Sequence, residues 1–316
     1  MGWVRIDTGL FERERTRQEA ARARKLENIY HVGQEKIWDG RVVLADLVRQ
    51  HGGIHMHPAQ KRSLARVFSG LMWGELAAWK ISAQLADRLE DYEAKLAATS
   101  QVHDESRHFY VLHDYLEQLD VDVPNLDAAT RYLLETVLST ESVAQKLVGM
   151  QLFVETMALT IFKMVRELQV EPVLSALLLY FERDEARHVG LGVQYSPTLL
   201  RDLTPLEQAK LSAFQAQILL ASLFSLKRME PSLRSLGVDP RALSESGEDM
   251  MRKVMEQVLE ANAGHPLGAI AGPFVDRSFA VTRELMFPAA ETSMVGRLFK
   301  AGRALVTPRE PRRHAA

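Results

Sequence analysis

The sequence predicts an all-α protein, a four-helix bundle with additional helices before and after it. The first observation is that no segment of the 316 residues shows a convincing run of the alternating pattern typical of a β-strand. The second is that apolar residues from Pro58 to Tyr195 recur at helical spacing over long stretches with short breaks. The third is that one motif, D-E-x-R-H, occurs twice, 80 residues apart, which indicates two helix pairs of similar plan.

The composition limits the class of protein. The chain is 47% hydrophobic, enough for a sizeable core, and its net charge of −2 gives no electrostatic reason to expect nucleic acid as a partner. It has no cysteine, which excludes disulfides, thiolate zinc sites, cysteine-ligated iron–sulfur clusters and a cysteine nucleophile. No signal peptide is apparent, and the longest apolar stretches, 173–181 and 218–226, are too short to span a bilayer. We therefore expect a soluble, cytoplasmic protein without a transmembrane segment.

Four parts of the chain are expected, each with its own pattern. The first part is strongly charged, the second has long helical runs, the third has helices separated by Pro and Gly, and the fourth is basic. They are an N-terminal extension at 1–57, the bundle core at 58–200, additional helices packed on the bundle at 201–293, and a basic tail at 294–316, expected to be solvated and partly disordered. Helices are expected at about 11–29, 42–50, 59–89, 92–119, 126–171, 172–195, 206–228, 248–260 and 274–286.

Local residues give the main boundaries of these helices. Trp38-Asp39-Gly40 predicts a turn or cap before a short helix, and the helical pattern of the core begins after Pro58. The segment Val121-Asp122-Val123-Pro124-Asn125 interrupts the pattern. Glu171-Pro172 ends one helix and begins the next, because proline suits the first helical turn. That last core helix is expected to stop near Tyr195-Ser196-Pro197.

The two copies of the motif are Asp104–His108 and Asp184–His188. Within each copy a Glu and a His stand three residues apart, so a helix presents both on one face. Each copy is preceded, 30 residues before its Glu, by another Glu. Two helices with Glu-x-x-His and two with a lone Glu can together enclose a dinuclear metal site. The six predicted ligands, which are also the predicted catalytic residues, are Glu75, Glu105, His108, Glu155, Glu185 and His188.

A solvated helical surface is the alternative to a metal site, because surface helices are rich in Glu. None of the other eight histidines, however, has a Glu three residues before it, and apolar runs flank the predicted ligands. A carboxylate buried in such surroundings is costly unless it is paired or binds a metal. Glu141 is the main rival of Glu155, which the equal spacing favours, and Glu182 could be an outer carboxylate or an extra ligand. The three histidines at 51–57 lie in a Gly/Pro loop without a carboxylate, so we expect no metal there.

Four carboxylates and two imidazoles suit iron or manganese rather than thiolate-held zinc, and four negative charges balance two divalent ions. We expect Glu105 and Glu185 to bridge the ions, the other two Glu to be terminal or shifting ligands, and each His to bind one ion. Metal-bound imidazoles usually donate their second N–H to a carboxylate. Two aspartates are available, each able to serve the His of the opposite helix, and two arginines would neutralise them. These supporting residues are Asp104, Asp184, Arg107 and Arg187.

The two motifs and six ligand positions, within residues 60–195, resemble the ferritin-like di-iron carboxylate superfamily. Within it they resemble the oxygen-activating branch, which includes ribonucleotide reductase small subunit-like oxidases and bacterial multicomponent monooxygenase hydroxylases. The resemblance implies a ferritin-like fold, two iron ions as Fe/Fe or Mn/Fe, and O2 as co-substrate. No single subfamily is matched throughout. Leu112 and Met150 stand where some members carry a radical or cross-linking Tyr. Phe181 stands where aryl-amine oxygenases carry another His, and Leu159 where many monooxygenases carry Thr.

Residues one helical turn from the predicted ligands are mostly apolar, which suits an organic substrate better than an iron-entry channel. We therefore expect an O2-activating di-iron oxidase or oxygenase acting on a small apolar or aromatic organic substrate by hydroxylation, desaturation or N-oxidation. The alternatives are a ferroxidase, peroxide-scavenging or iron-binding protein, and a metal-free structural bundle. The expected pocket residues are Met72, Ala78, Trp79, Leu112, Gln151, Leu152, Leu159, Leu178 and Phe181.

The reducing equivalents are expected to come from outside the chain. The sequence has no cysteine and no dinucleotide-binding G-x-G-x-x-G motif, so it carries no obvious electron store besides the metals. A separate ferredoxin or reductase, or the substrate itself, must then supply the electrons. The sequence leaves open the choice between Fe/Fe and Mn/Fe and whether the protein is a homodimer.

Overall fold

The computed structural model describes residue 10 and residues 14–262, 273–289 and 293–306. Every regular element in these residues is a helix, and they contain no strand, which confirms the all-α prediction. Most expected helices are present with bounds shifted by a few residues. In order, the elements are α1 (Arg17–Glu35), α2 (Gly40–His51), α3 (Pro58–Arg88), α4 (Tyr92–Glu117), α5 (Ala128–Ser139), α6 (Val143–Leu147), the π-helical segment η1 (Val148–Val154), α7 (Glu155–Glu167), α8 (Pro172–Leu200), α9 (Pro205–Ser235), α10 (Pro240–Ala261), α11 (Pro273–Met286) and α12 (Met294–Val306).

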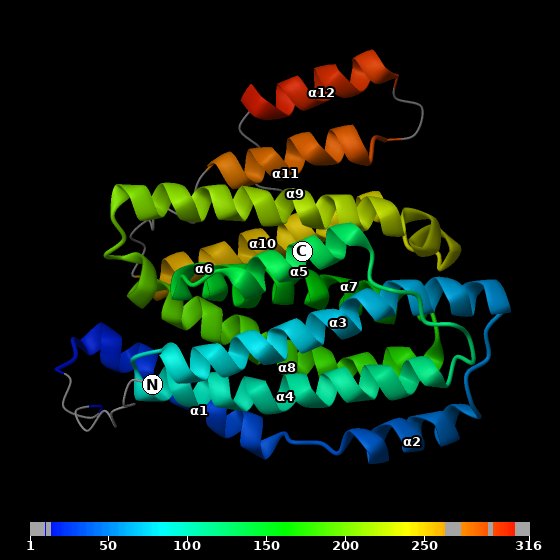
Figure 1. Ribbon diagram of the computed structural model, residues 1–316, viewed down its shortest axis with the longest axis horizontal. Coiled ribbons are helices and arrows are strands. Elements are labelled where there is room, and N and C mark those ends of the chain that lie inside the picture. The colour runs from blue at the N-terminus through cyan, green and yellow to red at the C-terminus, as the bar shows by residue number, and fades with distance from the viewer. Residues whose placement is uncertain (1–9, 11–13, 263–272, 290–292, 307–316) are drawn as a thin grey trace, which may run out of the picture.

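The core of the molecule lies among α3, α4, α8 and the continuous segment α6–η1–α7, which pack against one another (Figure 1). The start of α8 shows how the sequence places these helices. Pro172 occupies the first turn, and the Glu171 carboxylate accepts hydrogen bonds from the backbone N–H groups of Val173 and Leu174. The Tyr115 hydroxyl on α4 donates to the same carboxylate at 2.9 Å. The beginning of α8 is therefore tied to the end of α4.

The helix α8 does not end at Ser196-Pro197, as the sequence predicted, but continues to Leu200. Proline removes one backbone hydrogen bond from a helix, which is why an end was expected there. The Ser196 hydroxyl instead donates to the Gly192 carbonyl at 2.5 Å, and Pro197 is buried in the core. The backbone hydrogen bond that Pro197 cannot form lies in the last turn of α8. Its loss affects few other hydrogen bonds, and the packing of Pro197 in the core keeps the last turn helical.

The helix that carries Glu155 is not regular. The expected continuous helix is divided into α5, a short break, α6, the π-helical segment η1 and α7. At the end of η1 the Glu155 backbone N–H bonds to the Met150 carbonyl, five residues earlier, so this turn holds one residue more than an α-helical turn. The register of α7, and with it the direction of Glu155, is thereby shifted relative to a regular helix.

Residues of the N-terminal extension lie along one side of the core, where α1 packs on α4 and α8 and α2 packs on the same two helices (Figure 1). A capping box between Thr16 and Glu19 begins α1, and the Asp39 side chain caps α2. Trp38, directly before that cap, is buried. The extension therefore covers one flank of the core helices and contributes to their interior.

On the opposite side, α9 packs on α3 and α5, and α10 packs on α7 and α8. The helix α11 lies on α9, and α12 lies on α11 (Figure 1). Residues 294–306 of the expected solvated, partly disordered tail form the helix α12, most of whose described side chains are exposed. Residues 307–316, the rest of the predicted basic tail, lie outside the described residues.

Two described helices are long and apolar enough to cross a bilayer by length and composition alone, namely Val143–Glu167 and Pro205–Ser235. From the sequence we expected every apolar stretch to be too short to span a bilayer, and by length and composition these two helices are long enough. The apolar part of Val143–Glu167 is 67% buried within the protein, and that of Pro205–Ser235 is 44% buried. Core helices of soluble proteins have the same character, and the fold is consistent with a soluble protein.

Candidate metal centre

The structure brings all six predicted ligands together in the interior of the core helices. They form two overlapping groups, in each of which the candidate ligand atoms lie within 4.8 Å of one another. Both groups contain Glu105 and Glu185, the positions expected to bridge two ions. The first group adds Glu75 and His108, and the second adds Glu155 and His188. Every one of the six is at most 4% exposed, so no carboxylate is stabilised by bulk water.

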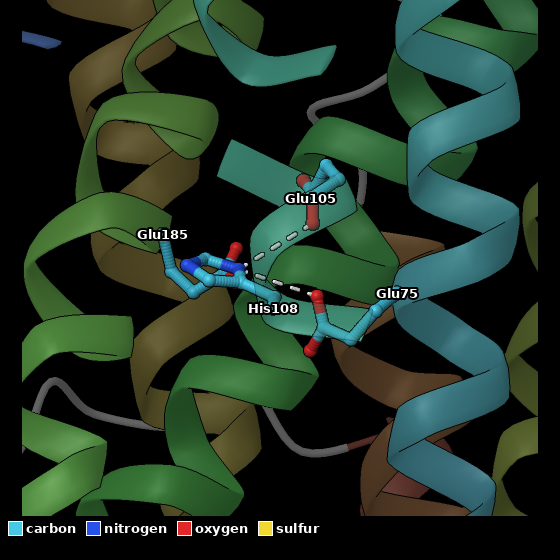
Figure 2. Close-up of side chains that lie close together, drawn as sticks. All are labelled: Glu75, Glu105, His108 and Glu185. Atoms are coloured by element: carbon cyan, nitrogen blue, oxygen red, sulfur yellow. Dashed lines mark ion pairs between the residues drawn. The ribbon is translucent and has the colours of Figure 1, made fainter. Parts of the chain in front are cut away.

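In the first group three carboxylates converge on one imidazole (Figure 2). The Nδ1 atom of His108 lies 3.1 Å from a Glu185 oxygen, 3.4 Å from a Glu75 oxygen and 3.6 Å from a Glu105 oxygen. Glu75 comes from α3, Glu105 and His108 from α4, and Glu185 from α8. Residues distant in the sequence thus direct their oxygen and nitrogen atoms toward one point.

The second group is built in the same way around the other imidazole. The Nδ1 atom of His188 lies 3.0 Å from a Glu105 oxygen and 3.0 Å from a Glu185 oxygen. Glu155, from the start of α7, is connected to the group by Gln101, whose amide donates to Glu155 at 2.9 Å and to Glu105 at 2.8 Å. The glutamine holds these two carboxylates in place next to His188.

Three buried ligand atoms in the first group have no hydrogen-bond partner among the described residues: Glu105 Oε2, His108 Nδ1 and Glu185 Oε1. They lie near each other: His108 Nδ1 is 3.1 Å from Glu185 Oε1 and 3.6 Å from Glu105 Oε2. Each unpartnered buried polar atom costs roughly 1–3 kcal/mol. A divalent cation coordinated by all three would remove that cost. The oxygen and nitrogen donors, without sulfur, suit iron or manganese.

The far side of each imidazole contacts an aspartate from the opposite motif. His108 Nε2 lies 3.3 Å from Asp184 Oδ2, and His188 Nε2 lies 3.3 Å from Asp104 Oδ2. Arg107 and Arg187 each form ion pairs with both aspartates. This crossed arrangement turns the Nδ1 atom of each imidazole toward the glutamates and fixes the orientation of both rings.

The charges of the cluster shift its pKa values in opposite directions. Burial, together with the negative charges of Glu105 and Glu185, raises the pKa of Glu155 well above its usual range. Burial opposes ionisation of Glu105 as well, but the two imidazoles outweigh it and hold the pKa of Glu105 well below its usual range. Burial disfavours the charged form of His108, yet its contacts with Asp184 and the glutamates raise the pKa of His108 well above the ordinary value. A divalent ion would thus have to displace protons from the imidazoles.

The structure adds two residues that the sequence did not indicate as parts of the site, and it gives Phe181 a contact that was not expected. Gln101 stands one turn before Glu105 on the same face of α4, a spacing that could have revealed it. Trp38 donates its indole N–H to Asp184 at 2.7 Å, and the Arg107 guanidinium lies over its ring. Phe181, predicted only as pocket lining, stacks on His108 with ring centroids 4.2 Å apart. No pattern relates Trp38 to the motifs, because it belongs to the N-terminal extension.

Other candidates lie away from the cluster. Glu141 is exposed at 93% of its side chain and faces Arg88, so it does not compete with Glu155. Glu182 forms an ion pair with Arg166 at 2.6 Å and is not a member of either group. The histidines at 51–57 form no metal-type group among the described residues. The imidazole of His57 instead accepts a hydrogen bond from a backbone N–H at the start of α3.

A largely apolar cavity of about 110 Å³ adjoins the cluster, and its wall includes Glu75 and Glu155. One buried water needs only about 10–15 Å³ by the same measure, so the cavity has room for an organic group. Its other walls come from α3, α5, η1, α7, α9 and α10. Of the nine expected pocket residues only Ala78 lines it. That expectation was otherwise wrong, because packing against α5, α9 and α10 decides where the core is open.

The amino-acid sequence matches no protein-family model and no curated protein at a significant level.

Proposed function

We propose that this protein is an O2-activating dinuclear iron oxidase or oxygenase that acts on an apolar or aromatic organic substrate. One observation supports this proposal above all others. The apolar cavity shares Glu75 and Glu155 with the six-residue cluster, so a molecule in the cavity would lie directly beside the metal ligands. A mostly apolar cavity with a few convergent polar groups is typical of a site for a small organic molecule.

We further propose that α3, α4, α6–η1–α7 and α8 form a four-helix bundle of the ferritin-like kind. Its support is the repeated plan, in which α3 and α7 each contribute a lone Glu while α4 and α8 each contribute Glu-x-x-His. The packing of these helices around the two groups agrees with such a bundle. In this arrangement the six residues would hold two ions: Glu105 and Glu185 belong to both groups, His108 would serve the first ion and His188 the second.

Two bound iron ions would supply the coordination sites and electrons for the reduction of O2. The protein's own residues have separate tasks. The imidazoles are oriented by two aspartates and their arginine partners, namely Asp104, Asp184, Arg107 and Arg187. Gln101 positions Glu105 and Glu155. The apolar walls exclude water and hold the substrate beside Glu75 and Glu155. In hydroxylation of a C–H bond, O2 takes two electrons from that bond and, by way of the iron ions, two electrons from a donor, and with two protons it forms the hydroxyl group and one water. We propose that a separate ferredoxin or reductase in the cytoplasm supplies those electrons.

The test is the reaction of the iron-loaded, reduced protein with O2 in the presence and absence of apolar organic compounds. Alkyl-chain compounds, arenes and aryl amines should be offered under ¹⁸O₂, and the products analysed by mass spectrometry. We expect multiple turnovers only when an organic compound and an electron donor are both present. Repeated oxidation of ferrous iron without any organic product would contradict the proposal and favour the ferroxidase alternative. The absence of any reaction with O2 would contradict both.

A further inference from the structure

The last described helix, α12, is amphipathic in an unusual way. At 100° per residue, its bulky residues Met294, Leu298, Val295 and Phe299 fall within an arc of about 140°. The charged residues of the helix are Arg297, Lys300 and Arg303, and all of them lie outside that arc. The helix contains no acidic residue. One side of α12 is therefore apolar and the other is purely basic.

The apolar side of α12 faces away from the protein. Met294 is 74% exposed, Val295 77%, Leu298 61% and Phe299 72%, whereas Ala301, next to Met294 at the edge of the arc, is 5% exposed. The helix packs on α11 and is the outermost element at its end of the molecule (Figure 1). A contiguous group of large apolar side chains on such an element marks an interaction surface.

The charge of this end of the chain has the opposite sign to the rest. The last 24 residues contain six Lys and Arg and one Glu, a formal charge of +5. The whole chain carries −2, so residues 1–292 carry −7. An anionic surface would therefore attract the end that bears α12 and repel the remainder of the protein. Attraction of this kind fixes which side of the molecule approaches.

We propose that α12 docks the protein on an anionic lipid surface, with its apolar side inserted at the level of the headgroups. Large apolar residues on one side and only basic residues on the other are the features by which a helix lies in a membrane interface. The basic residues then reach lipid phosphates and carboxylates at the surface. A nucleic acid would use the positive charge but leave the apolar side uncovered. This peripheral contact is independent of the metal centre and of the reaction proposed for it.

The test is flotation of the full-length protein with vesicles of phosphatidylcholine alone and with vesicles that also contain phosphatidylserine. We expect binding to the anionic vesicles, little binding to the neutral ones, and weaker binding as salt is raised. Leu298→Asp should weaken binding at least about tenfold, because it places a charge in the apolar side. Leu179→Asp is the matched control, since Leu179 on α8 is similarly exposed, at 54%, and should leave binding unchanged.

Arg303→Glu provides a second variant that acts on charge and leaves the apolar side intact. It should also weaken binding to anionic vesicles about tenfold. Failure of the unmodified protein to bind anionic vesicles would overturn the proposal, as would binding that Leu298→Asp and Arg303→Glu leave unchanged. If sedimentation instead showed a dimer that Leu298→Asp dissociates, without vesicle binding, a second copy of the chain would cover this surface and the proposal would be wrong.

Discussion

Replacing Glu155 with glutamine is expected to stabilise the metal-free protein and to abolish most of the stabilisation that metal provides. Burial and the neighbouring charges of Glu105 and Glu185 raise the pKa of Glu155, which means that the folded protein resists a charge at this position. A neutral amide of the same shape removes the cost of placing a negative charge at this buried position. Its oxygen can still accept the hydrogen bond from Gln101. The free energy of unfolding of the metal-free protein should rise on the order of 1 kcal/mol.

The metal-loaded protein should respond in the opposite direction. A bound ion stabilises the folded state by about 4 kcal/mol when its free concentration is about 1,000 times its Kd. Glu155→Gln removes one anionic ligand of the second group, so the increase in unfolding free energy on adding iron should fall by at least half. Urea unfolding of both variants, with and without anaerobically added ferrous iron, measures the two effects. The changes in unfolding free energy without and with iron should have opposite signs only if the Glu155 carboxylate is a metal ligand and does not stabilise the metal-free fold.

Glu182→Gln is the matched control for this experiment. Glu182 is a glutamate on α8, three residues before Glu185, but it pairs with Arg166 outside the cluster. Loss of that partly exposed ion pair should cost at most about 1 kcal/mol and leave the effect of iron unchanged. If Glu155→Gln destabilised the metal-free protein and kept the full effect of iron, Glu155 would be a structural residue and not a ligand.

Replacing Gly74 with leucine is expected to block oxidation of the organic substrate without disturbing the metal centre. Gly74 lies on α3 beside Glu75 and lines the cavity, and a Cβ atom built on it would have no neighbour within 4 Å. A glycine inside a helix costs about 1 kcal/mol relative to alanine, and no close packing at this position explains that cost. The missing side chain leaves room in the cavity next to a candidate ligand.

A leucine at this position would occupy the space that we assign to the substrate. Turnover of the organic substrate should fall at least about 100-fold, which corresponds to about 2.7 kcal/mol in the activation free energy. The iron content of the protein should stay unchanged. Gly74→Ala is the control, because it adds only a methyl group and should stabilise α3 by about 0.5–1 kcal/mol while most activity remains. Unchanged turnover by Gly74→Leu would show that the substrate binds elsewhere. If Gly74→Leu still oxidised ferrous iron, the cavity would be required for oxidation of the organic substrate but not for the reaction of the metal centre with O2.

The repeated motif, together with the glutamate that stands 30 residues before each copy, was sufficient to predict which six side chains meet. Within the motif, the spacing of Glu and His along a helix determines the face they share. It could not predict their surroundings. The π-helical turn before Glu155 has an ordinary apolar composition, so nothing in the sequence distinguishes it from an α-helix. It shifts the register by one residue, and the residues placed near Glu155 by regular spacing on its N-terminal side, Gln151 and Leu152, do not line the cavity.

The periodicity of the sequence also could not predict contacts between distant parts of the chain. Trp38 bonds to Asp184 across 146 residues, and its position depends on how α1 and α2 pack on the core. The C-terminal basic residues predicted a positive charge at this end of the chain but did not predict its secondary structure. Their composition suggested a solvated end, whereas the apolar residues between them, including Leu298 and Phe299, form a helix with a distinct apolar side.

The most direct measurement is the metal content of the purified protein, determined by mass spectrometry after expression with both iron and manganese supplied. Two groups that share Glu105 and Glu185 predict two ions per chain, and their identity distinguishes Fe/Fe from Mn/Fe. Glu155→Gln should contain fewer ions than the unmodified protein, and Glu182→Gln should contain the same number. A metal content near zero that anaerobic loading does not restore would contradict the dinuclear site. The buried carboxylates and imidazoles would then belong to a structural core.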